Sequence, residues 1–406
     1  MHSTTKRLDD DLDPVALGAR SGLLWARDGF ALAGIGEAVS IPFGPGSATA
    51  ATNTLAGLHG DDEVEVPGSG PVAFASLPFD RDLVDRLIVP RIVVGRSAGG
   101  DRWLTTIGDM SLEEAVDEAK TTLDRAVPSG PEPSQFRLDA TLAPEIWRDE
   151  VVGFARDRIR AGDLTKAVLA RELRLRTDHP IDSALVVDRL MATFPAAIIF
   201  SVDGFVGASP ELLVAREGDV VRAHPLAGTA PRSSDPATDA AHSAGLLSST
   251  KDRWEHRITI DWLLDTLLPF CSYVDAEPEP TIVTLANVHH LGTRVEGRLS
   301  SPASSVLELV QALHPTPAVG GQPQSVALDL IEGLERADRG RYAGPCGWVD
   351  GAGNGGFAVS VRSAEINGTE ARIFAGVGVV GDSDPAAELA ETRSKFQAML
   401  GALIRP

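Results

Sequence analysis

The chain has 406 residues, of which 43% are hydrophobic and 23% are charged, a composition typical of a globular protein with a large core. Its net charge of −20 argues against nucleic acid and anionic membranes as partners, because both attract basic surfaces. The first residues, MHSTTKRLDDDLDP, contain no apolar segment typical of a signal peptide, and only two cysteines are present. We therefore expect a cytoplasmic protein with no membrane span and no disulfide framework.

The first third of the chain is predicted to be rich in strands. Residues 1–20 are expected to form a polar tail. Residues 21–140 contain short apolar runs such as VAFASLPF and RLIVPRIVVGR, separated by Gly, Pro and Asp, and they are assigned to the N-terminal portion of the same fold as the rest of the chain. Residues 110–127 predict an amphipathic helix, and PSGPEPSQ at 128–135 is the best candidate for a linker.

Residues 141–406 are predicted to form the catalytic region. It opens with an amphipathic helix over residues 142–162 that ends at Gly162. After it, strands and helices mix without a regular alternation, and Asn367-Gly368 is a hairpin signal between two strands. We therefore predict an α+β fold, a single large domain with layered, mainly antiparallel sheets flanked by helices.

Lys166 stands at the head of the apolar strand KAVLAR, where a valine would be unremarkable. Only five of the 37 basic residues are lysines, namely Lys6, Lys120, Lys166, Lys251 and Lys395. The chain therefore builds its general positive surface from arginine. Lys166 could still be a solvated strand end, but the scarcity of lysine favours a role that needs an amine.

Two predicted helices each place two carboxylates three residues apart. One carries Asp252 and Glu255, and the other, which begins at Asp384-Pro385, carries Glu388 and Glu391. Residues at this spacing share one face of a helix, so each helix presents a carboxylate pair in one direction. Two converging pairs would suit a hard cation such as Mg²⁺. Spacing alone also fits two solvated acidic faces.

Other polar residues lie beside apolar strands. Glu211 follows Pro210 between two strands, where desolvation would raise its pKa and make it a candidate general acid. His290 is a further catalytic candidate. Arg362 alternates with valines, so it needs an anion, for which a structural carboxylate and a substrate carboxylate fit equally well. GVGVVG at 376–381 matches a dinucleotide motif but lacks the second strand, so its glycines favour close approach to a small anion.

Together these segments resemble the chorismate-utilising enzymes, a family that includes isochorismate, salicylate, anthranilate and aminodeoxychorismate synthases. The segments that carry the resemblance occur in order as KAVLAR, GASPELLV, PLAGTAPR, KDRWEH, HHLGTRVEG, LHPTPAVGG, ERADRGRYAGPCGWVD, FAVSVRSAEI and AGVGVVGDSDPAAELAETRSK. The resemblance implies one α+β domain with two layers of antiparallel sheet around the active site, and Mg²⁺ as the only cofactor.

The resemblance also implies roles for individual residues. The implied metal cluster comprises Asp252, Glu255, Glu388 and Glu391. The ring carboxylate of chorismate is held by the metal and by backbone N–H groups at Gly228, Thr229, Gly376 and Gly378. Tyr342 and Arg362 resemble the clamp on the enolpyruvyl carboxylate. Lys395 would add positive charge near the metal cluster.

Lys166 indicates which reaction the resemblance implies. Water-adding members of the family carry a lysine at this position, so we expect water addition at C2 of chorismate with loss of the C4 hydroxyl, which gives isochorismate. Neutral Lys166 would take a proton from water and protonated Glu211 would give one to the leaving hydroxyl. The alternative is a salicylate synthase, which adds pyruvate elimination. We expect a monomer that binds chorismate without an amidotransferase subunit.

Overall fold

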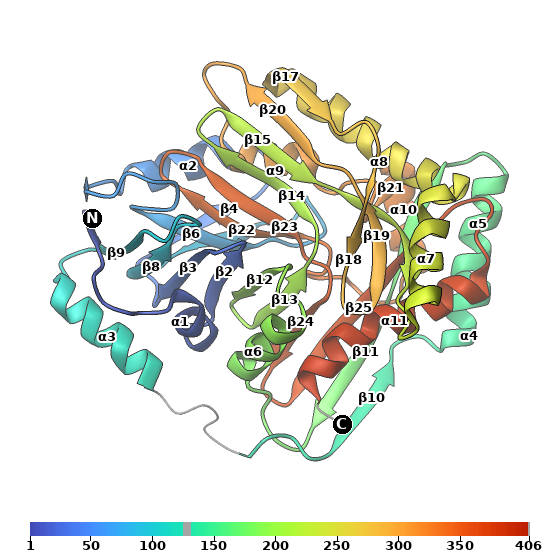
Figure 1. Cartoon of the computed structure of the whole chain (residues 1–406), viewed down its shortest axis with the longest axis horizontal. Coiled ribbons are helices and arrows are strands. Elements are labelled where there is room, and N and C mark those ends of the chain that lie inside the picture. The colour runs from blue at the N-terminus through green and yellow to red at the C-terminus, as the bar shows by residue number, and fades with distance from the viewer. Residues whose placement is uncertain (125–130, 405–406) are drawn as a thin grey trace.

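The computed structural model describes residues 1–124 and 131–404, and three mainly antiparallel sheets organise them (Figure 1). The largest has 13 strands. In order across the sheet they are β10 (Phe136–Ala140), β11 (Lys166–Thr177), β25 (Glu370–Val379), β24 (Ser363–Asn367), β13 (Phe205–Ser209), β12 (Ile198–Val202), β2 (Leu23–Arg27), β3 (Phe30–Ile35), β8 (Ile92–Arg96), β9 (Arg102–Ile107), β1 (Ser3–Arg7) and β5 (Asp61–Asp62), with β21 (Gly321–Gln322) beside β11.

A second sheet has nine strands and a third has three. The second sheet runs through β17 (Cys271–Ala276), β20 (Val295–Leu299), β15 (Val220–His224), β14 (Leu212–Glu217), β23 (Gly355–Val359), β22 (Pro345–Asp350), β6 (Val72–Ser76), β7 (Asp85–Val89) and β4 (Val39–Phe43). The third contains β16 (Leu226–Pro231), β19 (Val288–Gly292) and β18 (Thr281–Thr284).

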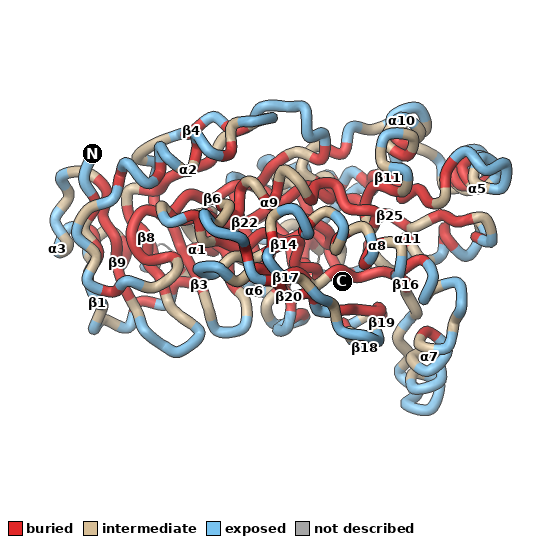
Figure 2. Tube along the Cα trace, turned by 90° about the horizontal axis from the view of Figure 1, so that it is seen from above, coloured by how far each residue is buried: buried red, intermediate tan, exposed pale blue. Residues whose placement is uncertain are grey.

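Helices cover the outer faces of the sheets. They are α1 (Pro14–Ser21), α2 (Ala48–Ala56), α3 (Leu112–Asp124), α4 (Pro144–Ile146), the π-helical η1 (Trp147–Val152), α5 (Gly153–Arg160), α6 (Ser183–Thr193), α7 (Pro236–Ser248), α8 (Thr250–Leu267), the 3₁₀-helical η2 (Leu268–Phe270), α9 (Val306–Leu313), α10 (Gln324–Leu334) and α11 (Pro385–Leu403). Figure 2 shows the buried strands between these more exposed helices, and α7 projects from the body.

The two large sheets pack face to face through an aromatic-rich core. Trp25 and Trp103 from the first sheet and Phe74 and Trp348 from the second are buried in one cluster. The outer face of the first sheet packs on α6 and α11 through a separate cluster that includes Leu190 and Phe396. Alternating side chains therefore bury both faces of the first sheet, as expected for layered sheets. The predicted α+β fold with mainly antiparallel sheets is confirmed.

The predicted polar tail at residues 1–20 is wrong. Residues 3–7 form β1, which pairs with β9 and β5, and residues 14–21 form α1. Ser3 and Thr5 are buried by strand alternation, and the Thr5 hydroxyl hydrogen-bonds to that of Thr105. The Asp13 side chain accepts from two backbone N–H groups at the start of α1. Asp-Pro is a recognised helix start, so part of this signal was present in the sequence.

Several local predictions are confirmed. The predicted helix at 142–162 exists as the continuous α4, η1 and α5, and Gly162 has the left-handed φ of +87° that ends it. Asn367 and Gly368 lie in the turn between β24 and β25. The helix predicted at 110–127 is seen as α3, and its last residues, like residues 128–130 of the predicted linker, lie outside the described residues. The antiparallel pairing of β25 excludes a dinucleotide-binding βαβ unit there.

Within residues 1–124 and 131–404, no helix is both long and apolar enough to cross a bilayer.

Candidate active site

One pocket brings together nearly all the predicted site residues. Its volume is about 280 Å³, and it is lined from β11, β16, β19 and β25 and from the helices α8 and α11. Thirteen of the fourteen predicted site residues line it, namely Glu211, Gly228, Thr229, Asp252, Glu255, His290, Tyr342, Arg362, Gly376, Gly378, Glu388, Glu391 and Lys395. The fourteenth, Lys166, contacts this pocket through Glu255.

Lys166 is the first residue of β11 and its side chain is 1% exposed. Its Nζ lies 3.0 Å from the Glu255 Oε1 atom. A buried ammonium group needs such a partner, because its desolvation is otherwise costly. An ion pair requires the charged amine, whereas the predicted role as a base requires the neutral amine. The pair with Glu255 must therefore open, and the amine must lose its proton, before Lys166 can accept a proton.

The glycine at position 378 makes this ion pair possible. Gly378 lies opposite Val168 in the pairing of β25 with β11. A Cβ at this position would lie 2.3 Å from the Glu255 Oε1 atom and 3.1 Å from the Lys166 Cε atom. Any other residue would displace the carboxylate. The group that lies against the GVG backbone here is a protein carboxylate, and the approach of a small anion stays a prediction.

Glu211 follows β13 and is buried. Desolvation raises its pKa to about 7, and the positive charges of Lys166, Arg362 and Lys395 only partly oppose this effect. A carboxyl group that holds its proton near neutral pH can donate it to a leaving hydroxyl. The predicted desolvation is confirmed, and the geometry permits a general acid at this position.

His290 orients Arg362, which is also buried. The Nδ1 atom of His290 lies 3.1 Å from the Gly228 carbonyl oxygen, which only accepts, so Nδ1 carries the hydrogen. The Nε2 atom then accepts from the Arg362 Nη2 group at 2.8 Å. Burial and the Arg362 and Lys395 charges lower the pKa of His290 well below its ordinary value. Since both ring nitrogens are engaged, these contacts favour a positioning role over the predicted catalytic one.

Arg362 has an unsatisfied donor at the pocket. Its φ is +54°, a strained value for a non-glycine residue, and among the described residues its Nε–H has no hydrogen-bond partner. A buried guanidinium group with a free N–H suits an anionic ligand. Of the two partners left open by the sequence, the structure therefore favours a ligand carboxylate.

Tyr342 and Lys395 meet at Gly376. Tyr342 is buried and its ring stacks on Phe374, with centroids 5.1 Å apart. A Cβ at Gly376 would lie 3.1 Å from the Tyr342 hydroxyl oxygen. The Lys395 Nζ group donates to the Gly376 carbonyl oxygen at 2.9 Å and pairs with Glu391 at 2.6 Å. The hydroxyl and the amine are therefore held on the same short stretch of β25.

The four acidic residues of α8 and α11 face the same pocket. Burial and repulsion from Glu391 raise the pKa of Glu388, and burial raises the pKa of Asp252. A cation bound beside these carboxylates would offset the cost of burying them. Oxygen ligands in such a site suit a hard divalent cation. Across the described part of the chain, however, no three potential ligands stand close enough to hold a metal as they are now placed.

Lysine side chains form ion pairs with three of these four acidic residues. Glu255 pairs with Lys166, Glu391 with Lys395, and Glu388 with Lys251 at 3.5 Å. Three of the five lysines of the chain thus lie in this one site. Lys251 was not predicted as a site residue, but the scarcity of lysine and its position beside Asp252 were signals for it.

Comparison with known proteins agrees with this geometry. Residues 18–404 match the family described as chorismate binding enzyme. The chain belongs to this chorismate-binding family. It is 39% identical over 351 residues to a MenF protein of Mycobacterium tuberculosis, with 83% of this chain and 87% of that protein covered. It is 36% identical over 347 residues to the isochorismate synthase DhbC of Bacillus subtilis, covering 82% and 81%.

A solved structure shares the fold of this chorismate-binding chain. The menaquinone-specific isochorismate synthase MenF of Escherichia coli superimposes with a TM-score of 0.81 at 24% identity, over 99% of this chain and 94% of that one. The layered sheets described above are therefore the fold of a chorismate-binding enzyme.

The buried Glu211 predicts a pH-dependent stability. Its pKa lies near 7 in the folded protein and near 4.5 when exposed, so between these values the folded state holds a proton that the unfolded chain releases. Its contribution to stability is full below pH 4.5 and is lost as pH rises to 7. Gln cannot ionise, so Glu211→Gln should gain about 3 kcal/mol relative to wild type between pH 4.5 and 8. Urea unfolding at both pH values measures this gain.

The exposed Glu217 lies on the neighbouring β14 and provides a matched control, Glu217→Gln. Equal stability differences for Glu211→Gln at the two pH values would show that folding does not change the pKa of Glu211.

Proposed function

We propose that this chain is an isochorismate synthase, which converts chorismate to isochorismate by adding water at C2 and releasing the C4 hydroxyl. The observation that carries the proposal is a buried amine, Lys166, in the same site as a carboxyl group whose pKa is near 7, Glu211. Membership of the chorismate-binding family and similarity to DhbC support the choice of substrate and reaction.

The polar groups of the pocket suit a ligand with two carboxylates. Arg362 and Tyr342 would bind the enolpyruvyl carboxylate, because the free Arg362 N–H and the Tyr342 hydroxyl are both donors. The backbone at Gly376 and Gly378 would lie close to the ring carboxylate of chorismate, because these residues have no side chains to keep it away. Two anchored carboxylates would fix the ring, and therefore the position of C2 and C4, relative to the reacting side chains.

Mg²⁺ is the proposed cofactor. Asp252, Glu255, Glu388 and Glu391 would hold it, because they line one pocket with oxygen ligands, and burial together with repulsion between neighbouring carboxylates raises the pKa of Glu388 and Asp252. When bound, Mg²⁺ supplies positive charge that holds and polarises the ring carboxylate of chorismate. Recruitment of Glu255 as a ligand would compete with its ion pair to Lys166.

Lys166 and Glu211 would then carry the two proton transfers. Lys166, once released from Glu255 and deprotonated to solvent, accepts a proton from the water that adds at C2. Glu211, protonated near neutral pH, donates a proton to the hydroxyl that leaves C4. Lys166 gains one proton and Glu211 loses one. Both side chains return to their starting states when Lys166 releases its proton to solvent and Glu211 takes one up. Each transfer by a positioned group typically contributes about 10²–10⁴-fold in rate.

The alternative function is a salicylate synthase, which would use the same first step and then eliminate pyruvate. The similarity to isochorismate synthases favours a chain that stops at isochorismate. Stoichiometric pyruvate and salicylate from purified protein would instead identify the salicylate synthase.

Removing the Lys166 amine tests the mechanism. We expect Lys166→Met to lower kcat by about 10²–10⁴-fold while chorismate still binds, because the amine acts on water rather than on a carboxylate. Steady-state kinetics and equilibrium binding of chorismate measure the two effects. Lys120→Met, on α3 and paired with Asp10, should change neither. Full turnover by Lys166→Met at saturating chorismate would overturn the mechanism.

The lysine pairs predict how the metal site responds to mutation. Lys251→Met removes the positive charge that lies beside Glu388 and would compete with a metal ion for it. We therefore expect Mg²⁺ to bind on the order of tenfold more tightly, a change of about 1.4 kcal/mol. Isothermal titration of the metal into substrate-free protein measures this, again with Lys120→Met as control. Weaker binding by Lys251→Met would show that Lys251 supports the metal site rather than competing for it.

A further inference from the structure

The loop between α10 and β22 carries Tyr342, and it is fastened to the strand that carries Lys166. On one side of β11, β21 pairs with Lys166 and Ala167, and β10 pairs with residues 173–177. Among the described residues, the stretch between them has no strand partner on this side. The unpaired backbone N–H and C=O groups of a strand edge need other hydrogen-bond partners when they are buried.

Side chains take the place of the missing strand. The Arg339 Nη2 group donates to the Val168 carbonyl oxygen at 2.7 Å, and the Glu335 Oε1 atom accepts from the Ala170 N–H at 2.7 Å. The Trp147 indole N–H donates to the Ala170 carbonyl oxygen at 3.1 Å. Arg339 and Glu335 thus hydrogen-bond the backbone two and four residues beyond Lys166.

Arg339 is itself completely enclosed. It is 4% exposed, its guanidinium group contacts Glu335 at 2.6 and 2.8 Å, and its Nη1 group donates to the Val319 carbonyl oxygen at 2.9 Å. It also lies over the Phe79 ring, 4.2 Å from the centroid. A buried ion pair of this kind contributes little net stability, since desolvation offsets its attraction, but it holds its neighbours in one geometry.

The same residue is joined to Tyr342. The Arg339 carbonyl oxygen accepts from the Tyr342 N–H at 3.0 Å, which forms a tight turn. Val168 and Val319, whose carbonyls Arg339 contacts, line the active-site pocket together with Tyr342. Movement of the Arg339 side chain would therefore change the positions of both Tyr342 and the end of β11 that carries Lys166.

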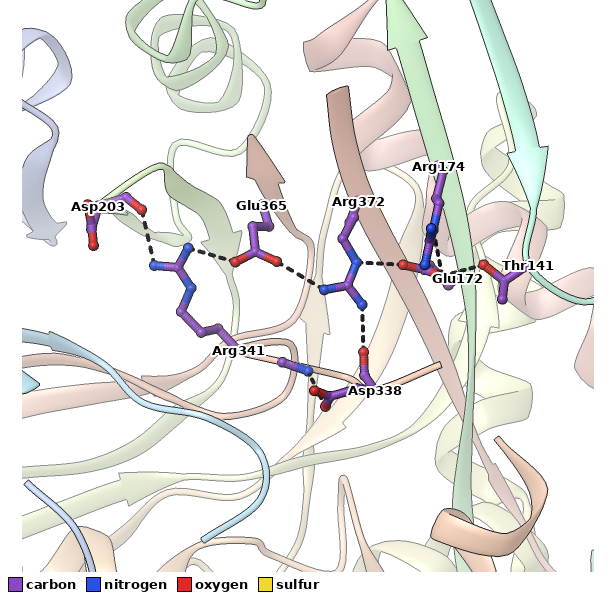
Figure 3. Close-up of polar contacts among 9 residues, drawn as sticks. Thr141, Glu172, Arg174, Asp203, Asp338, Arg341, Glu365 and Arg372 are labelled. Atoms are coloured by element: carbon purple, nitrogen blue, oxygen red, sulfur yellow. Dashed lines mark hydrogen bonds and ion pairs between the residues drawn. The ribbon is translucent and has the colours of Figure 1, made fainter. Parts of the chain in front are cut away.

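A ladder of ion pairs fastens the other side of this loop (Figure 3). Glu365 on β24 joins Arg341 at 2.9 Å and Arg372 at 3.1 Å. Arg372 continues to Glu172 on β11 at 2.6 Å and donates to the Asp338 carbonyl oxygen at 2.6 Å. The ladder fixes where the loop lies on the sheet, and Arg339 fixes how the loop approaches the pocket.

We propose that Arg339, held by Glu335, is a positioning residue that sets the place of Tyr342 relative to Lys166. The geometry is independent of the reaction, and only the kinetic part of its test depends on the proposed function. Without Arg339, the Val168 carbonyl and the loop lose a shared anchor, and Tyr342 is free to leave its stack on Phe374.

The chain has only two tyrosines, and this permits a direct test. Protein labelled with fluorotyrosine should give two ¹⁹F resonances, one from the exposed Tyr273 and one from the buried Tyr342. We expect Arg339→Met to shift or split the Tyr342 resonance and leave that of Tyr273 unchanged. The control Arg176→Met, on β11, loses only exposed contacts such as the ion pair to Glu370 on β25, so it should leave both resonances unchanged.

Kinetics with chorismate give the second measurement. We expect KM to rise about tenfold in Arg339→Met and by less in Arg339→Lys, which retains the charge. A purely structural role would lower the fraction of active enzyme without changing KM or the Tyr342 resonance. If Arg339→Met does not fold, Glu335→Gln decides in its place, because it keeps an acceptor for the Ala170 N–H but loses the charge.

Folded Arg339→Met or Glu335→Gln with an unchanged Tyr342 resonance and an unchanged KM would overturn the proposal. If the wild type does not turn over chorismate, the proposed function fails, while the ¹⁹F spectra still decide on the role of Arg339.

Discussion

The active site depends on the antiparallel pairing of β11 with β25. Ten residue pairs, from Ala167 with Val379 to Arg176 with Glu370, join segments more than 190 residues apart in the chain. This register sets Gly378 and Gly376 beside the Lys166 end of β11, and because β25 leads into α11, it also delivers Glu388 and Glu391 to the same place. A shift by one residue would turn every side chain of β11 to the opposite face.

Charge balance is the second constraint. The pocket gathers five carboxylates and the amines of three lysines beside Arg362 in a mostly buried space. Isolated charges in such a place are costly, so each lysine is paired and Glu211 is left to hold its proton. The proposed cofactor and substrate fit this arrangement as one cation and two anionic groups that would rearrange the same pairs. The contacts that balance the buried charges are therefore the same contacts that the proposed reaction would use.

Much of the fold and site was predictable because it rests on local patterns. Alternating apolar residues indicated the strands, the Asp384-Pro385 start indicated α11, and i, i+3 spacing placed each carboxylate pair on one face. The predicted tail was wrong because Ser3 and Thr5 are polar by type yet buried by their partner strand. Partners across the site, such as Glu255 for Lys166 or Gly228 for His290, depend on long-range register, which a single sequence does not contain. The hydrogen bonds from the Arg339 and Glu335 side chains to the backbone of β11 could not be predicted for the same reason.

The central claim is that this chain adds water to C2 of chorismate and releases the product without eliminating pyruvate. The most direct measurement is incubation with chorismate and Mg²⁺ in ¹⁸O-labelled water, followed by mass spectrometry of the products. The account predicts isochorismate that carries one ¹⁸O atom in its C2 hydroxyl, with no stoichiometric pyruvate. Unlabelled isochorismate would contradict water addition, and salicylate formed together with pyruvate would contradict a reaction that stops at isochorismate.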